Sequence, residues 1–223
     1  MLAGAQIAPT SSDAVGCTFT SECYEFKIHG KPFKFHDTAG LGECAEGKVS
    51  APQAIENLFR LIRELEGGIS LLVYVVRGPR LRDAARKNYL MFYEIFCEEQ
   101  VPIVVVVTGL EEEKDRQAWW GRNESHFLKQ RIVFGAAACI TATPGKRGVY
   151  EEEYEESKKS VQDVVLRWCA QEPWRPVTVI SWFSKVCKVG IRLDHVIIAK
   201  IHLSPAATTK IAVFEIPFAR ISS

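Results

Sequence analysis

Three short polar segments in this sequence each stand at the end of an apolar, strand-like run, and their side chains could bind a charged or polar ligand. They are Asp37 to Gly40, Thr108 to Glu111 and Thr141 to Thr143. In α/β sheets, ligands bind beyond the carboxyl ends of the strands, where such segments gather. A fourth segment, Ser12 to Thr18, precedes the first strand-like run and ends in a hydroxyl group. These four segments hold the candidate binding residues.

Each of these residues also has an ordinary structural explanation. A solvated Asp that opens a turn is common, so Asp37 alone does not establish a site. Glu111 could simply begin the helix after Val107, because the helix dipole favours acidic side chains there. Thr18 in a loop needs no special explanation. A functional site is therefore expected only if the fold brings the segments together.

The composition favours an intracellular globular protein. Its 28 basic and 27 acidic residues nearly balance, which gives no electrostatic reason to expect nucleic acid as a partner. Its seven cysteines form no CxxC pair and show no zinc spacing with histidine, so reduced thiols are expected. The N-terminal stretch MLAGAQIAPTSSD lacks the basic start and the apolar run of a secretory signal. We therefore expect a cytoplasmic protein with one main α/β domain.

Three kinds of apolar pattern predict the strands of a sheet. Alternating apolar positions over 23–28 and 33–37, with a glycine turn between them, predict a β-hairpin. Two nearly unbroken aliphatic runs, 69–76 and 101–107, are typical of parallel strands that are covered on both faces. A shorter run near 136–142 predicts one more strand.

Helical patterns alternate with these strands. Ser50 and Gln53 form a capping box at the start of a helix whose apolar residues repeat as far as Leu65. Further helices are expected over 82–98, 112–130 and 151–170. This alternation predicts an α/β fold with a doubly wound, mostly parallel sheet.

The order and spacing of the polar segments resemble the guanine-nucleotide-binding domain (G domain) of the P-loop GTPases. The resemblance covers about residues 1–170, within an expected truncated G domain of residues 1–172. It is closest to the group that holds septins, immunity-associated GTPases and chloroplast-translocon GTPases, and to fungal proteins that contain a G domain. The resemblance implies a P-loop NTPase fold, GTP or GDP with Mg²⁺ as cofactors, and GTP hydrolysis. It also implies a guanine nucleotide as partner, and homo- or heterodimers formed through the G domain.

At the phosphate end, the resemblance assigns roles to three residues. Asp37 would hold Mg²⁺, commonly through a water, because Mg²⁺ retains waters and uses few carboxylates. The hydroxyl of Thr18 would bind the same ion only in the triphosphate state. The backbone N–H of Gly40 would face the γ-phosphate. Loss of that phosphate would release residues 9–20, which makes the switch.

At the base end, Thr108 to Glu111 corresponds to the Asn/Thr-Lys-x-Asp motif of this family. Glu111 would accept two hydrogen bonds from the guanine edge, and the backbone of Thr141 and Ala142 would receive the guanine carbonyl. Gly109 stands where the family has a lysine whose stem lies along the base, and Glu111 is one methylene longer than Asp. Whether Glu111 reads guanine or only begins a helix therefore stays open.

Two other features depart from the family. Leu41 stands where small GTPases place a water-orienting glutamine, so slow intrinsic hydrolysis is expected. The phosphate-cradling motif G-x-x-x-x-G-K-[ST] has no full match, because the nearest string, 42–49, ends in Val49, which cannot ligate Mg²⁺. We expect that the chain begins just after this P-loop. The central first strand, between the strands at 33–37 and 69–76, would then be missing.

Residues 173–223 form the expected irregular C-terminal tail. It carries an apolar helical stretch over 177–190 and strand-like runs that include 211–218. One tail strand could fill the vacant central slot, or pair as a small hairpin packed against the body. A membrane-surface helix over 177–190 is the alternative, although no run reaches the roughly 18 residues of a membrane span.

The sequence thus predicts a GTP-binding, GTPase-like switch that senses phosphate through Mg²⁺, with nucleotide binding weakened by the missing P-loop. The alternative is a non-catalytic interaction protein that keeps the GTPase scaffold as a pairing surface. Mg²⁺-dependent binding of a GTP analogue would distinguish the two.

Overall fold

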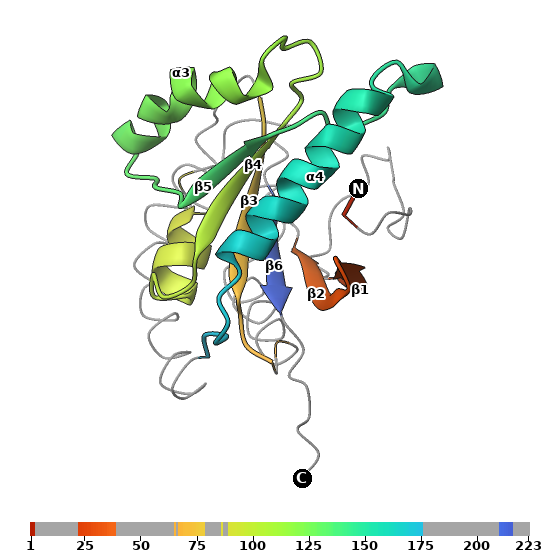
Figure 1. Ribbon diagram of the computed structural model, residues 1–223. Coiled ribbons are helices and arrows are strands. Elements are labelled where there is room, and N and C mark those ends of the chain that lie inside the picture. Colours follow the sequence, from red (N-terminus) through yellow and green to blue (C-terminus); the bar gives the residue numbers. More distant parts are fainter. Residues whose placement is uncertain are drawn as a thin grey trace, which may run out of the picture.

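Six strands form one sheet in the computed structural model, which describes residues 1–2, 22–38, 65, 67–78, 86, 89–175 and 210–215 (Figure 1). The strands are β1 (Glu22–Ile28), β2 (Lys31–Thr38), β3 (Leu71–Arg77), β4 (Ile103–Thr108), β5 (Ala136–Cys139) and β6 (Lys210–Glu215). Their order across the sheet is β1-β2-β6-β3-β4-β5. With helices packed against this sheet, the chain has the predicted α/β class.

The β-hairpin is confirmed. β1 and β2 pair antiparallel, with Cys23 opposite His36 and Phe26 opposite Phe33. The turn between them places Gly30 at a φ of +79°, a left-handed conformation that glycine adopts without the steric cost of a Cβ. β2 ends at Thr38, so the candidate segment Asp37 to Gly40 is described only for its first two residues, Asp37 and Thr38.

The aliphatic runs form the predicted parallel strands. β3 pairs with β4 in parallel, with Val73 opposite Val104, and β4 pairs with β5 in the same sense. β3 begins at Leu71, two residues later than predicted, because Ile69 instead forms an isolated bridge with Trp174. β5 ends at Cys139, which makes it shorter than the predicted strand.

A strand from the C-terminal tail lies in the centre of the sheet. β6 pairs with β2, with Lys34 opposite Glu215, and with β3, with Leu71 opposite Phe214. Of the two placements that the sequence left open for a tail strand, the structure shows the one in the slot between those two strands. Both pairings are antiparallel, so the expectation of a mostly parallel sheet is wrong for this part. β6 begins at the carboxyl edge, where Lys210 is level with Val75, and can therefore only run against its neighbours.

Four helical segments are described beside the sheet. They are the π-helix η1 (Leu90–Phe96), α3 (Arg116–Lys129), the short 3₁₀-helix η2 (Lys146–Gly148) and α4 (Glu151–Trp168). α3 and α4 confirm the predicted helices over 112–130 and 151–170. The Asp115 side chain caps α3 by accepting a hydrogen bond of 3.0 Å from the Ala118 N–H, which delays its start. The helix predicted to start at Ser50 lies outside the described residues.

The predicted helix over 82–98 is α-helical at Arg86 and Tyr89, but it is wound as a π-helix over Leu90–Phe96. The Cys97 N–H donates to the Phe92 carbonyl, five residues back, which is the hydrogen bond of a π-helix. Tyr89, Phe92 and Phe96 are buried, while Tyr93 is half-buried. These large rings pack in one cluster with Tyr74 of β3, against the sheet.

Both faces of the sheet are covered, and each has its own hydrophobic core. On one face, Tyr74 of β3 packs in a cluster with Phe92 of η1 and Phe127 of α3. On the other face, Val73 of β3 packs in a cluster with Val161 of α4. Figure 1 shows α4 running across the sheet on this second face. The alternation along β3 thus supplies both cores, as expected for a strand buried on two sides.

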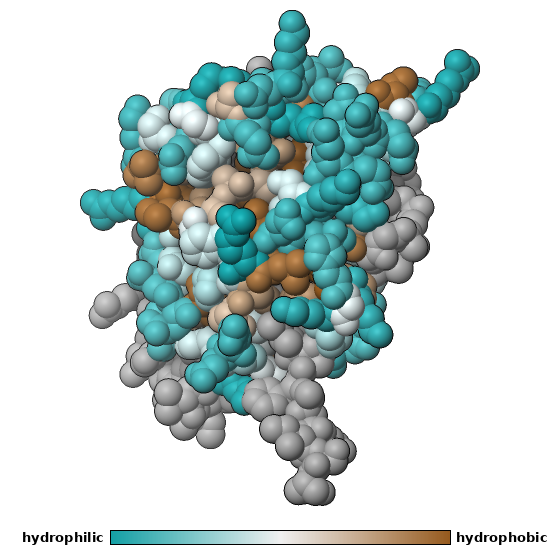
Figure 2. Space-filling view, in the orientation of Figure 1, coloured by the Kyte–Doolittle hydropathy of each residue, from teal (hydrophilic) through white to brown (hydrophobic). Residues whose placement is uncertain are grey.

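The surface around α4 is mostly hydrophilic, with small hydrophobic areas between the polar groups (Figure 2). Leu128, Val133 and Val149 are large hydrophobic residues that are more than half exposed. Isolated exposed hydrophobic residues are normal on soluble surfaces. Within the described ranges, no helix combines the length and the apolarity needed to cross a membrane.

Candidate functional site

The carboxyl ends of four strands face the same edge of the sheet. β3, β4 and β5 run parallel, and β2 runs in their direction because β6 is antiparallel to both β2 and β3. The loops after β4 and β5 therefore leave the sheet side by side. The candidate base-end residues, Thr108 to Glu111 and Thr141 to Ala142, lie in or next to these two loops.

The two loops are joined by a pair of hydrogen bonds. The Ala142 N–H donates to Glu111 Oε1 over 3.4 Å, and the Tyr150 hydroxyl donates to Glu112 Oε1 over 2.7 Å. The second bond raises the pKa of Tyr150, because the bond to the Glu112 carboxylate favours the protonated phenol. The structure thus brings Glu111 and Ala142 into direct contact, although they lie far apart in the sequence.

The position of Ala142 is set by its buried neighbour Thr141. Thr141 is fully buried, and its N–H donates to the hydroxyl oxygen of Ser157 on α4 over 2.9 Å. Within the part of the chain that the structure describes, the Thr141 hydroxyl has no hydrogen-bond partner. Ala142, the next residue, is exposed. Ser157 of α4 therefore holds the β5–α4 loop at Thr141, while the Ala142 amide stays at the surface.

Thr108 connects the ends of β4 and β3. Its hydroxyl donates to the Val76 carbonyl over 3.3 Å, and its own carbonyl accepts from the Gly78 N–H over 2.8 Å. These bonds hold the start of the β4–α3 loop against the end of β3. In this structure the Thr108 side chain supports the loop that carries Glu111.

The phosphate-end candidates are described only in part. Thr18 and Gly40 lie outside the described residues, and Asp37 is described by its backbone. Across β6, Asp37 is level with Val73, four residues before the end of β3 at Arg77. At about 3.3 Å per residue, Asp37 lies roughly 13 Å lower along the strands than the end of β3. Asp37 and Glu111 are thus well separated, so only an extended ligand could reach both.

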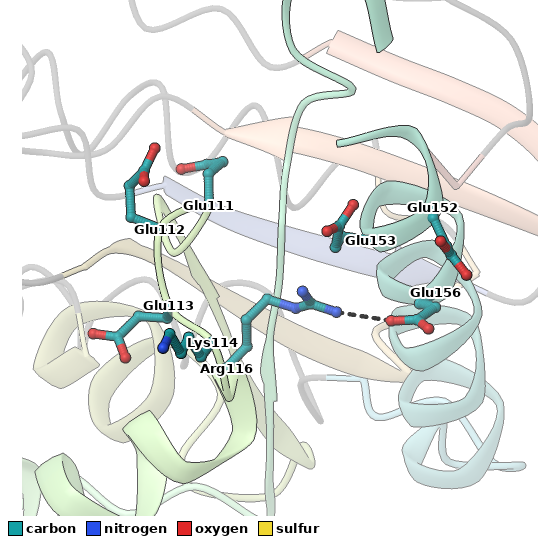
Figure 3. A pocket seen from close by; sticks show the side chains of 8 residues that line it. All are labelled: Glu111, Glu112, Glu113, Lys114, Arg116, Glu152, Glu153 and Glu156. Carbon is teal, nitrogen blue, oxygen red and sulfur yellow. Dashed lines mark hydrogen bonds and ion pairs between the residues drawn. The ribbon is translucent and has the colours of Figure 1, made fainter. Parts of the chain in front are cut away.

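An acidic hollow of about 400 Å³ lies between the β4–α3 loop and the start of α4 (Figure 3). Its lining residues are Glu111, Glu112, Glu113, Lys114, Arg116, Glu152, Glu153 and Glu156. Arg116 reaches across the hollow and forms an ion pair of 2.9 Å with Glu156. Six carboxylates against two basic groups make this hollow unfavourable for a phosphate group. Any phosphate bound near Glu111 would have to lie on another side of the loop.

The acidic hollow was not expected from the sequence. The run EEEYEES over 151–157 is acidic, but acids in the first turn of a helix already have an explanation in the helix dipole. This run lies opposite Glu111 to Glu113 because the fold brings the β4–α3 loop close to the start of α4. No local sequence pattern encodes that arrangement. Within the described residues, no group of three or more His, Cys, Asp or Glu side chains is arranged to hold a metal ion.

No family model, no curated protein and no solved structure matches this chain.

Proposed function

We propose that this chain is a GTPase-like guanine-nucleotide-binding domain in which Glu111 and the Ala142 amide bind the base. The observation that carries the proposal is the 3.4 Å distance between Glu111 Oε1 and the Ala142 nitrogen. Guanine presents two adjacent donors, N1–H and the 2-amino group, next to the O6 acceptor. A carboxylate beside an exposed, weakly bonded N–H matches that pattern, whereas adenine presents an acceptor at N1 that a carboxylate would repel.

The hydrogen bond between Glu111 and Ala142 is long and solvent-accessible, since Ala142 is exposed. A ligand can therefore replace it at small cost, with guanine O6 accepting from Ala142 and the guanine donors bonding to Glu111. Hydrogen bonds to a charged group contribute about 1.5–3 kcal/mol each, more than the weak contact they would replace. The pair is thus suited to recognise guanine and to close on itself when no base is bound.

At the other end of the nucleotide, Asp37 and Thr18 would bind Mg²⁺. The backbone N–H of Gly40 would bind the γ-phosphate. Bound Mg²⁺ would neutralise phosphate charge and make the Thr18 loop sensitive to loss of the γ-phosphate. The 223 residues contain no G-x-x-x-x-G-K-[ST] motif. Weak phosphate binding is therefore part of the proposal. Leu41 in place of a water-orienting glutamine adds slow hydrolysis.

The second candidate is a non-catalytic interaction protein with a GTPase-like scaffold. One observation favours it: β6 pairs on both sides and so completes the centre of the sheet within this chain. A sheet completed in this way needs no nucleotide for its stability. The two candidates differ in whether a guanine nucleotide binds at all.

Titration of the full chain with a fluorescent N-methylanthraniloyl GTP, with and without Mg²⁺, tests the proposal. Saturable, Mg²⁺-dependent binding that GDP displaces and ATP does not would support the GTPase-like function. No binding up to millimolar nucleotide would leave the interaction protein as the better account.

A substitution at Glu111 tests the base contact itself. Glu111→Gln replaces one acceptor with a donor that faces the guanine 2-amino group, so the affinity for guanine nucleotide should fall about tenfold or more. Affinity for a xanthosine nucleotide, which has a carbonyl at that position, should rise relative to guanosine. Glu124→Gln, an exposed position on α3, is the matched control and should leave both affinities unchanged. Equal behaviour of the two variants would contradict the assignment of Glu111.

A further inference from the structure

Arg77 is the last residue of β3 and lies beside the start of the loop that carries Glu111. Its Cα is opposite that of Thr108, the last residue of β4 before the β4–α3 loop. The next residue, Gly78, donates its N–H to the Thr108 carbonyl, which holds the two chain segments together. Arg77 is exposed to solvent. A cationic side chain is thus held at the same sheet edge as Glu111 and Ala142.

The side chain of Arg77 packs over Gly109. A Cβ built onto Gly109 would lie 3.0 Å from Arg77 Cγ and 3.3 Å from Arg77 Nε. Gly109 also has a φ of +75°, a conformation that residues with side chains rarely adopt. The side chain of Arg77 therefore occupies the space that a side chain at position 109 would need. Arg77 and Glu111 flank the same short loop.

The Arg77 guanidinium has no hydrogen bond or ion pair with any residue that the structure describes. In the same part of the chain, Arg116 pairs with Glu156 and Arg122 pairs with Glu113, each over 2.9 Å. The absence of such a pair for Arg77 among the described residues is notable because the nearby β4–α3 loop is rich in carboxylates that an arginine could bind. Arg77 instead lies over a glycine with its planar group available to a ligand.

We propose that Arg77 stacks its guanidinium on one face of the purine base held by Glu111 and Ala142. This inference rests on the proposed guanine-nucleotide binding and adds a residue to that site. Guanidinium groups are planar and weakly hydrated, and they stack on aromatic faces, including those of nucleobases. Glu111 would bind the edge of the base while Arg77 covers its face. The contact is with the π-face, so it adds affinity for a purine without selecting guanine over adenine.

The test compares three versions of the full chain by titration with N-methylanthraniloyl GDP: the wild type, Arg77→Ala and Arg77→Lys. The Arg77→Ala protein should bind GDP about fivefold to 100-fold more weakly than the wild type, because base stacking is lost. Arg77→Lys keeps the charge but not the plane, so it should recover little of that loss. Lys129→Ala, which removes an exposed cation at the far end of α3, is the control and should bind as the wild type does.

A ligand without a base separates stacking from charge. Inorganic triphosphate should displace the fluorescent nucleotide from the Arg77→Lys protein and the wild type with the same inhibition constant. If Arg77→Lys restores wild-type GDP binding, or if Arg77→Ala weakens triphosphate as much as GDP, then Arg77 acts through charge and the stacking inference is wrong. Binding of GDP by Arg77→Ala within twofold of the wild type would overturn only the role of Arg77. Absence of binding by the wild type would overturn the proposed function and this inference together.

Misfolding of the variants is checked by thermal unfolding without ligand. Arg77 is exposed and has no partner in the described residues, so its substitution should leave the melting temperature within about 2 °C. Gly109→Ala gives independent information, because its methyl group would contact Arg77 Cγ and displace the side chain. It should weaken GDP binding in the same direction as Arg77→Ala. Unchanged GDP binding by a folded Gly109→Ala protein would contradict the stacking geometry.

Discussion

At the scale of single residues, Ser157 shows how the core supports the candidate site. Its hydroxyl is buried on α4 and accepts the Thr141 N–H over 2.9 Å. Ser157→Ala would leave that buried N–H without its acceptor, which typically costs about 1–3 kcal/mol of unfolding free energy. Urea unfolding should show this loss, whereas Ser160→Ala, at a half-buried position on the same helix, should change stability by less than about 0.5 kcal/mol. Equal effects of the two substitutions would contradict the role of Ser157.

Two glycines give a matched residue-scale prediction. A Cβ on Gly135 would lie 2.2 Å from Trp168 Cζ3, a distance at which one of the two must move. Gly121, within α3, has nothing within 4 Å of such a Cβ. Gly135→Ala should therefore destabilise the protein by about 1–3 kcal/mol, and Gly121→Ala should stabilise it by about 0.5–1 kcal/mol. Thermal unfolding checks the pair, and a stable Gly135→Ala protein would show that Trp168 moves freely.

Two thiols with raised pKa values predict how the stability of the protein depends on pH. Burial raises the pKa of Cys139 to about 11 and that of Cys169 to about 12. Thiols in the unfolded chain have a pKa near 8.5, so above that pH the unfolded state releases protons that the folded state retains. The unfolding free energy should therefore fall as the pH rises from about 9 to 11. Urea unfolding at pH 8 and pH 10.5 measures the fall, and a Cys139→Ala variant should show a smaller one.

At the scale of elements, β6 decides how the sheet is completed. It pairs with β2 and β3, so its amides should be among the best protected in the chain. For a global stability of about 5 kcal/mol, exchange of the amides in 211–215 should be slowed roughly 1,000-fold or more. Hydrogen exchange followed by mass spectrometry measures this, with the exposed η2 segment as a rapidly exchanging control. Fast exchange over 211–215 would contradict the central position of β6.

The sequence allowed most elements to be predicted, for reasons that differ between them. Unbroken aliphatic runs are strong signals of buried parallel strands, and β3 and β4 follow them closely. The vacancy between β2 and β3 was inferred from a resemblance, and apolar character in the tail suggested an occupant. The direction of β6 could not be predicted, because a strand pattern of period two is the same in both directions. The π-helical winding of η1 was also missed, because it covers only seven residues and the apolar positions there fit ordinary helical spacing.

At the scale of the whole molecule, two covered sheet faces leave the carboxyl edge as the place where loops meet. The family resemblance assigned Glu111 and Ala142 to the same end of a ligand, and in the structure Glu111 Oε1 lies 3.4 Å from the Ala142 nitrogen. The contribution of α4 to the acidic hollow and the placement of Arg77 over Gly109 were not predictable, because both depend on contacts between distant segments. Local patterns thus identified the loops of the candidate site. Only the fold showed that α4 and Arg77 lie next to them.

The central position of β6 also has a consequence for biosynthesis. β2 and β3 leave the ribosome well before residues 210–215, so each must wait with an unsatisfied hydrogen-bonding edge while the intervening chain is made. Such waiting edges attract strands of other chains, and pairing between distant segments is slow. Newly made copies should therefore depend on chaperones until that last strand arrives.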